Sequence, residues 1–261
     1  MAPVRLILAA LAFVGLVSGC SGKDEAAPGP VLSGADGAQR LREVFAAAMT
    51  SKKTVVITSY DEAGDGSASG EQTCKVRFTP AKASACEAKA GGAQQTRVIS
   101  MPDALYVFMP DPGENPGGKP WRRIDPNGTN MMAQLGKQIQ HMTDETLLTP
   151  GVSTVTGTHA DKVDGKRATR YELSVDVAAL TKTMLDHTTN DLLRGGLQDI
   201  SKNGAAMTAQ IWIGADNLPL KQVTKMSASM DSPAQVQTMT YGDWGAPLTI
   251  APPPADQVSA G

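Results

Sequence analysis

Residues 152–175, VSTVTGTHADKVDGKRATRYELSV, decide the class of fold. Two runs in this segment are rich in β-branched and aromatic residues, and they flank a polar stretch at residues 162–166. In the second run Tyr171, Leu173 and Val175 alternate with polar residues, which is the pattern of a strand with one buried face. The segment therefore predicts an antiparallel hairpin.

The same strand-like pattern extends along the chain in both directions, and Gly or Pro residues bound most of its runs. The segments that we expect to form strands are residues 54–60, 72–78, 85–90, 96–100, 104–109, 121–124, 152–161, 168–175, 206–213, 218–226 and 235–244. No stretch after residue 35 has the composition of a linker, so we expect residues 36–261 to form a single domain.

Three further segments carry apolar residues at helical spacing, which predicts helices at residues 36–49, 129–142 and 177–193. Asp36 is the expected N-cap of the first helix. Because strands and helices do not alternate, the pattern favours an α+β fold with helices on one face of an antiparallel sheet. So long a sheet must close, split or be covered, and we expect it to curl around helices that cover its concave face.

The first twenty residues have the features of an export signal. Arg5 precedes an apolar run that is shorter than the ~20 residues of a spanning helix, and the run ends in Val17-Ser18-Gly19-Cys20. This ending resembles a bacterial lipobox. We expect residues 1–19 to be a lipoprotein signal peptide and Cys20 to be lipidated; the alternative is an ordinary signal peptide with an incidental cysteine.

Lipidation of Cys20 would anchor the protein to the extracytoplasmic face of the cell membrane, because two or more acyl chains give stable anchoring. Residues 20–35 are rich in Gly, Ala, Ser and Pro, so we expect a flexible tether. At the other end of the chain, residues 255–261 are expected to fray.

The remaining cysteines, Cys74 and Cys86, lie on either side of the turn expected at residues 79–82. In an exported protein such a pair favours a disulfide between two strands. Two free thiols remain an alternative, and a metal pair is less favoured because no histidine lies close by in the sequence.

The composition and the motifs argue against several functional classes. The net charge of −2 gives no electrostatic reason to expect a nucleic-acid partner. No catalytic, metal or cofactor motif is evident, and Gly66-Ser67-Ala68-Ser69-Gly70 carries alanine where a serine hydrolase has its nucleophile. We therefore expect a protein without enzymatic activity, metal or cofactor.

Several short motifs, taken in their order and spacing, resemble the LolA/LppX-like lipoprotein family, in particular the LppX/LprG branch of actinobacterial exported lipoproteins. The motifs are residues 104–109 (ALYVFM) with 119–124 (KPWRRI), 163–166 (VDGK) with 169–173 (TRYEL), 211–214 (IWIG) with 218–221 (LPLK), and 241–245 (YGDWG) with 252–254 (PPP). With the first helix, the resemblance spans roughly residues 36–258.

The resemblance implies an antiparallel β half-barrel whose concave face is covered by helices that enclose an apolar cavity for acyl chains. It also implies an envelope protein that binds or carries an acyl lipid, a lipoglycan or a lipoprotein. We expect this protein to be a monomer. The twelve Met residues suit such a space, because Met adapts to irregular apolar volumes. The residues that we expect to line it, chosen by their facing, are Val107, Met109, Met131, Leu135, Leu180, Met184, Ile211 and Ile213.

Two other functions remain open at this stage. The same fold with a dry, filled core would act through its surface, as an accessory or signalling lipoprotein. A hydrolase of envelope components would need converging polar groups that the sequence does not display. An apolar space of about 300 Å³ or more between helices and sheet would favour a ligand.

Overall fold

The structure is a computed structural model that describes residues 29–63, 68–89, 95–111, 113, 117–126, 128, 144–186, 194–195, 198, 206–228 and 233–259. Cys20, the predicted signal peptide and the predicted helix at 129–142 lie outside these residues. Within them, the chain combines two α-helices with one large, mostly antiparallel sheet, which agrees with the α+β class expected from the sequence.

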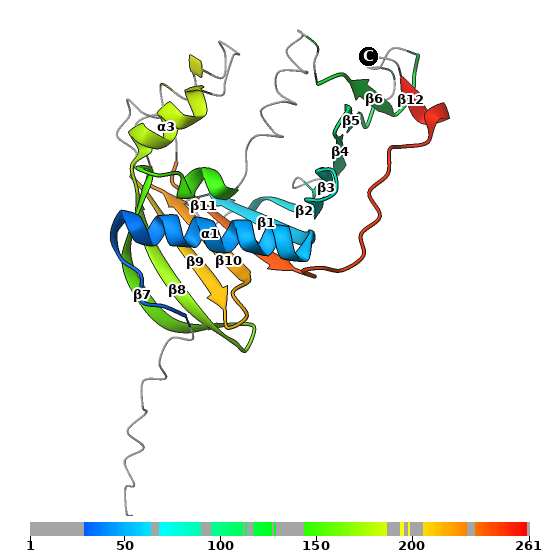
Figure 1. Cartoon of the computed structure of the whole chain (residues 1–261). Helices are drawn as coiled ribbons and strands as arrows, with labels where there is room; N and C mark the ends of the chain where they lie inside the picture. The colour runs from blue at the N-terminus through cyan, green and yellow to red at the C-terminus, as the bar shows by residue number, and fades with distance from the viewer. Residues whose placement is uncertain are drawn as a thin grey trace, which may run out of the picture.

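Twelve strands form this sheet in the order β12-β6-β5-β4-β3-β2-β1-β11-β10-β9-β8-β7. Strands β1 to β6 and strands β7 to β11 form two antiparallel meanders, which join where β1 pairs with β11 (Figure 1). The strands are β1 (Thr54–Ala63), β2 (Ala68–Arg77), β3 (Ala83–Lys89), β4 (Gln95–Met101), β5 (Ala104–Phe108), β6 (Trp121–Ile124), β7 (Ser153–Val163), β8 (Lys166–Val175), β9 (Met207–Gly214), β10 (Pro219–Met226), β11 (Gln235–Gly242) and β12 (Val258–Ser259).

The hairpin predicted from residues 152–175 is confirmed as β7 and β8. Its turn is made by Asp164 and Gly165, which both have positive φ (50° and 77°), as a tight two-residue hairpin turn requires. Tyr171, Leu173 and Val175 are all buried on the same face, as their alternation predicts.

Helix α1 (Gly34–Lys52) lies across one face of the sheet and contacts strands from β7 to β1 (Figure 1). It begins earlier than predicted, because Ser33 is the N-cap in place of Asp36. Asp36 lies in the first turn, where its carboxylate interacts favourably with the helix dipole and stabilises the helix. Leu41 and Phe45 face the sheet and are buried. The second helix, α3 (Val177–Asp186), was expected to continue to residue 193, but residues 187–193 lie outside the described residues.

Residues 29–33, the described end of the predicted tether ahead of α1, contact the β7–β8 hairpin. The backbone N–H of Gly29 donates to Thr169 Oγ1 (2.7 Å), and the Tyr171 hydroxyl donates to the carbonyl of Pro30 (3.0 Å). Thr158 Oγ1 accepts from the N–H of Leu32 (3.2 Å) and donates to its carbonyl (2.8 Å). This part of the segment is therefore held against the sheet.

The prediction that residues 255–261 fray is wrong for Val258 and Ser259, which form β12 and pair in parallel with β6. Ser259 is buried, and its hydroxyl donates to the carbonyl of Trp121 (3.0 Å). Lys119 Nζ donates to the carbonyl of Val258 (3.0 Å). A strand of two residues is too short to produce an alternating pattern, so it could not be predicted from the sequence.

None of the helices that the structure describes is both long and apolar enough to cross a membrane.

Replacing Leu41 by alanine should lower the free energy of unfolding by about 2–5 kcal/mol, because it removes a fully buried side chain between α1 and the sheet. Val31, whose side chain is 84% exposed, is the matched control, and its truncation should change stability by less than about 0.5 kcal/mol. Urea unfolding of the two variants measures both effects. Equal losses would show that α1 does not hold the core.

Candidate functional site

The face of the sheet that carries α1 holds the largest cluster of buried apolar residues in the described part of the chain. Its buried residues form one cluster, which we call the main core. The members of the main core are Ala38, Leu41, Phe45, Val55, Leu148, Val152, Val155, Tyr171, Leu173, Val175, Ala209, Ile211, Ile213 and Tyr241. Partly buried residues pack around it, among them Leu180, Met207 and Met239.

Three of the residues predicted to line a ligand space come together at the main core. Ile211 and Ile213 belong to it on β9, and Leu180 packs against it from α3. Met184 lies on the same helix and is partly buried. These four residues therefore come from two elements, β9 and α3, of the C-terminal half of the chain.

The other predicted lining residues lie elsewhere. Val107 belongs to a separate cluster with Val98, Leu105 and Ile124 on strands β4 to β6. Met109 follows β5 and is partly buried, and its backbone N–H donates to the carbonyl of Pro120 (2.8 Å). Met131 and Leu135 lie outside the described residues.

The strand register nevertheless places Val107 on the same face as the main core. Directly opposed residues of antiparallel strands point to the same side, and Ile57, Cys74, Cys86, Val98 and Val107 oppose one another in turn across β1 to β5. Ile57 packs against the main core. We call these five residues the apolar row; each of them is only partly buried.

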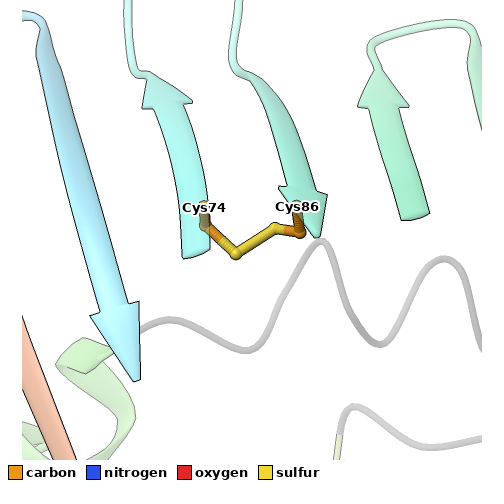
Figure 2. Close-up of a disulfide and its surroundings, with 2 residues drawn as sticks. All are labelled: Cys74 and Cys86. Atoms are coloured by element: carbon orange, nitrogen blue, oxygen red, sulfur yellow. A yellow bond between two sulfur atoms is a disulfide. The ribbon is translucent and has the colours of Figure 1, made fainter. Parts of the chain in front are cut away.

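The predicted disulfide between Cys74 and Cys86 is confirmed, and it lies within the apolar row. The two residues oppose each other on β2 and β3, with their Cα atoms 4.0 Å apart (Figure 2). The bond therefore fixes the pairing of two adjacent strands and places its sulfur atoms on the apolar face.

A feature that sequence reasoning missed is a pair of polar residues on this face, Gln222 and Thr224 of β10. The alternation Gln-Val-Thr indicates that Val223 is the buried residue facing the core, but the register shifts at a bulge between Pro219 and Lys221. Beyond the bulge, Gln222 opposes Ile211 and faces the main core, while Val223 packs with Trp212 on the opposite face. The signal for the bulge in the sequence is weak, because only Pro219 marks it.

The opposite face of the sheet holds a network of paired charges around Trp212. Its indole N–H donates to Asp161 Oδ2 (2.9 Å), and Arg170 bridges Asp161 and Glu172 at 3.2 Å to each. The indole hydrogen bond, a backbone N–H from Lys162 and the charge of Arg170 hold the pKa of Asp161 below its usual range. The carboxylates of Asp161 and Glu172 are thus paired with donors from Trp212 and Arg170, which is the arrangement of a structural network.

Among the described residues, no group of three or more His, Cys, Asp or Glu side chains could hold a metal ion. The histidine that the structure describes, His159, lies 3.6 Å from Glu172 in the network around Trp212, on the face away from the main core. The α1 face is thus mainly apolar, and polar side chains, Gln222 and Thr224 among them, interrupt it.

No protein-family model matches the sequence, and no curated protein does either. The fold is similar to that of the lipoprotein LppX from Mycobacterium tuberculosis, with a TM-score of 0.50 and 14% identity over 83% of this chain and 99% of that one. LprF from Mycobacterium bovis gives a TM-score of 0.47 with 16% identity, covering 85% of this chain and 99% of LprF. A lipoprotein-sorting domain assigned to the outer membrane of Vibrio parahaemolyticus gives 0.27 with 9% identity, covering 80% and 92%.

At 14% identity the likeness to LppX concerns the fold. As a similarity of fold, it confirms the resemblance indicated by the sequence motifs.

Replacing both Cys74 and Cys86 by serine should lower the free energy of unfolding by about 3 kcal/mol, because the bond closes a loop of 12 residues in the unfolded chain. Urea unfolding with and without dithiothreitol provides the measurement and its control: reductant should destabilise the wild-type chain and leave the variant unchanged. A wild-type chain as stable in reductant as without it would contradict the expectation.

Proposed function

We propose that this protein is a membrane-anchored lipoprotein of the cell envelope that binds or carries acyl lipids or lipidated molecules in an apolar space between its helices and its sheet. The observation that carries the proposal is the apolar face of the sheet. It runs from the main core under α1, across the disulfide, to Val107 on β5. The motif resemblance and the LppX-like fold support the same function.

The two parts of this face differ in how completely they are buried. Beneath α1, Leu41 and Ile211 are fully out of contact with solvent, whereas the five side chains of the apolar row remain partly exposed. Apolar surface that the fold leaves partly open is where an acyl chain gains free energy, at about 25 cal/mol per Å² removed from water. In the proposal the sheet curls as a half-barrel, so that the apolar row faces into a concave space.

Acyl chains would enter beside α3, where Leu180 and Met184 are partly buried. Met207 and Met239 border the main core, and their unbranched side chains adapt to ligands of different shape. The proposed lining includes Val107, Met109, Leu180 and Met184, with Met131 and Leu135 on the predicted helix at residues 129–142.

In this proposal Cys20 carries the lipid anchor on the extracytoplasmic face of the membrane, and residues 36–261 act as one monomeric domain. Its proposed ligand is an acyl lipid, a lipoglycan or a lipoprotein, and it binds the membrane through the lipid anchor on Cys20. Residues 29–33 are bound to β7 and β8, so the anchor would hold the sheet at a distance set by the residues between Cys20 and Gly29.

Close packing under α1 favours a second candidate function for this fold. Leu41, Val55 and Ile211 are fully buried in the main core, as they would be in a protein that binds nothing inside. Such a chain would be an accessory or signalling lipoprotein that acts through its surface. The two candidates differ in whether the purified protein contains lipid.

A chain lacking residues 1–20, purified without detergent, should release acyl lipid on organic extraction, as measured by mass spectrometry. Leu180→Glu should lower the lipid content several-fold, because it places a charge where α3 packs against the main core. Ala178→Glu adds the same charge at an exposed position of α3 and should leave the lipid content unchanged. Recovery of no acyl lipid from the unmodified chain would favour the accessory function.

Cys20→Ala in the full-length chain should abolish incorporation of labelled palmitate and release the protein from the membrane fraction. The reason is that the thiol of Cys20 is the proposed attachment point of the acyl chains. A Cys74→Ala/Cys86→Ala chain, which lacks the other two cysteines, should be labelled as the wild type is. Equal labelling of the Cys20→Ala chain would show that the N-terminal motif is not a lipidation site.

A further inference from the structure

Two polar atoms are buried without a hydrogen-bond partner on β10, in the middle of the apolar face. Gln222 is 1% exposed and Thr224 is 8% exposed. Gln222 Oε1 and Thr224 Oγ1 are both inaccessible to solvent and unpaired. Most buried polar atoms in folded proteins have a partner, so two unpaired atoms two residues apart on one strand need an explanation.

The register shows that both side chains point toward the α1 side. Gln222 lies between Ile211 of β9 and Met239 of β11. One step along the strand, Thr224 lies between Ala209 and Gln237. Because Ile211 and Ala209 belong to the main core, the two polar side chains interrupt the surface that the proposed function assigns to acyl lipid.

A polar row connects this pair to the exposed part of the same face. Gln237, which opposes Thr224, is exposed, and its amide donates to Asp61 Oδ1 on β1 (2.9 Å). The row therefore runs from an exposed amide and carboxylate at β11 and β1 to a buried hydroxyl and a buried amide at β10. A ligand that entered from this side would meet polar groups along the row before it reached the core.

We infer that Gln222 and Thr224 bind a free hydroxyl group of the ligand, so that the preferred ligands are acyl lipids that carry a hydroxyl close to the acyl chain. The inference rests on the proposed lipid-binding function. An amide oxygen accepts hydrogen bonds, and a threonine hydroxyl accepts one and donates one. A ligand hydroxyl can donate its one hydrogen to the amide oxygen and accept a hydrogen bond from the threonine hydroxyl, whereas an ester or a hydrocarbon chain has no donor for the amide oxygen.

An internal water molecule is the structural explanation for the same pair, because buried waters commonly satisfy polar atoms in a core. The two explanations predict opposite effects of apolar substitution. If water binds there as part of the fold, Gln222→Leu/Thr224→Val loses those bonds and destabilises the free protein. If the partner is a ligand, the same variant removes unpaired atoms from the free protein, which should unfold at the same or a higher temperature.

The test uses the full-length chain purified from membranes and three probes that share the palmitoyl chain. Methyl palmitate has no hydroxyl, 1-monopalmitoylglycerol carries hydroxyls on its head group, and methyl 3-hydroxypalmitate carries one on its acyl chain. Affinities are measured by competition with a fluorescent fatty acid. The proteins are the wild type, Gln222→Leu/Thr224→Val, and Thr240→Val, which makes the same threonine change at an exposed position on the opposite face of the sheet.

We expect the double variant to lose about tenfold in affinity for at least one hydroxylated probe, the size of effect that follows from losing one or two net hydrogen bonds. Its affinity for methyl palmitate should stay close to that of the wild type, and Thr240→Val should bind all three probes normally. The probe that loses affinity identifies the source of the hydroxyl, either the head group or the acyl chain.

Equal changes for all three probes, no change for either hydroxylated probe, or a lower unfolding temperature of the free variant would overturn the inference. These results leave the proposed function standing as long as the wild type binds methyl palmitate. A wild-type chain that binds none of the probes would contradict the proposed function itself, and this inference with it. If the double variant fails to fold, that too overturns the inference for Gln222, and Thr224→Val tests the threonine separately.

Discussion

The antiparallel pairing of β1 with β11 is the contact on which the rest of the structure depends. It joins residues 56–63 to residues 235–242 and turns two separate meanders into one sheet. Helix α1 ends at Lys52, and its C-cap Lys53 directly precedes β1, so the same pairing sets where the helix lies on the sheet. Phe45 of α1 meets Tyr241 of β11 edge to face, with 5.8 Å between ring centroids. Because this contact joins distant parts of the chain, its entropic cost must be offset by the core that it closes.

One consequence of the single sheet is a single apolar face that both halves of the chain share. The C-terminal meander contributes most of the main core, and the N-terminal meander contributes the apolar row. The Cys74–Cys86 bond lies in that row, away from α1, where packing is less complete and a covalent link contributes most to strand pairing. The network around Trp212 occupies the other face, beside a smaller apolar cluster of Ala168, Trp212 and Val223.

Much of the fold could be predicted, because long strands show alternation: the predicted hairpin agrees with β7 and β8 within a few residues. The short strand at residues 121–124 also has its predicted bounds. What failed were features that leave no periodic pattern, such as the first residues of α1, where the Ser33 side chain makes no capping hydrogen bond, and the two-residue strand β12. In the candidate site, Ile211, Ile213 and Leu180 do meet, whereas Val107 packs in its own cluster. The face to which the Gln222 side chain points could not be predicted from the alternation of residues, because one bulge reverses the two faces of β10.

In a lipid-binding protein, this bulge would affect the selectivity between ligands, because it places two polar side chains on the apolar face. A wholly apolar face would hold any acyl chain with a free energy that depends on buried area, and such a surface discriminates weakly between ligands of equal length. Two unpaired polar atoms on that face raise the free energy of every state in which they find no donor, including a complex with a purely apolar chain. The free protein carries the same cost, so binding of a purely apolar chain neither adds nor removes it. A ligand hydroxyl removes this cost, so selectivity comes from the hydrogen bonds that only the hydroxylated ligand forms. Because a ligand that binds only the folded chain also stabilises it, the hydroxylated ligand should stabilise the fold more than its apolar counterpart at equal concentration.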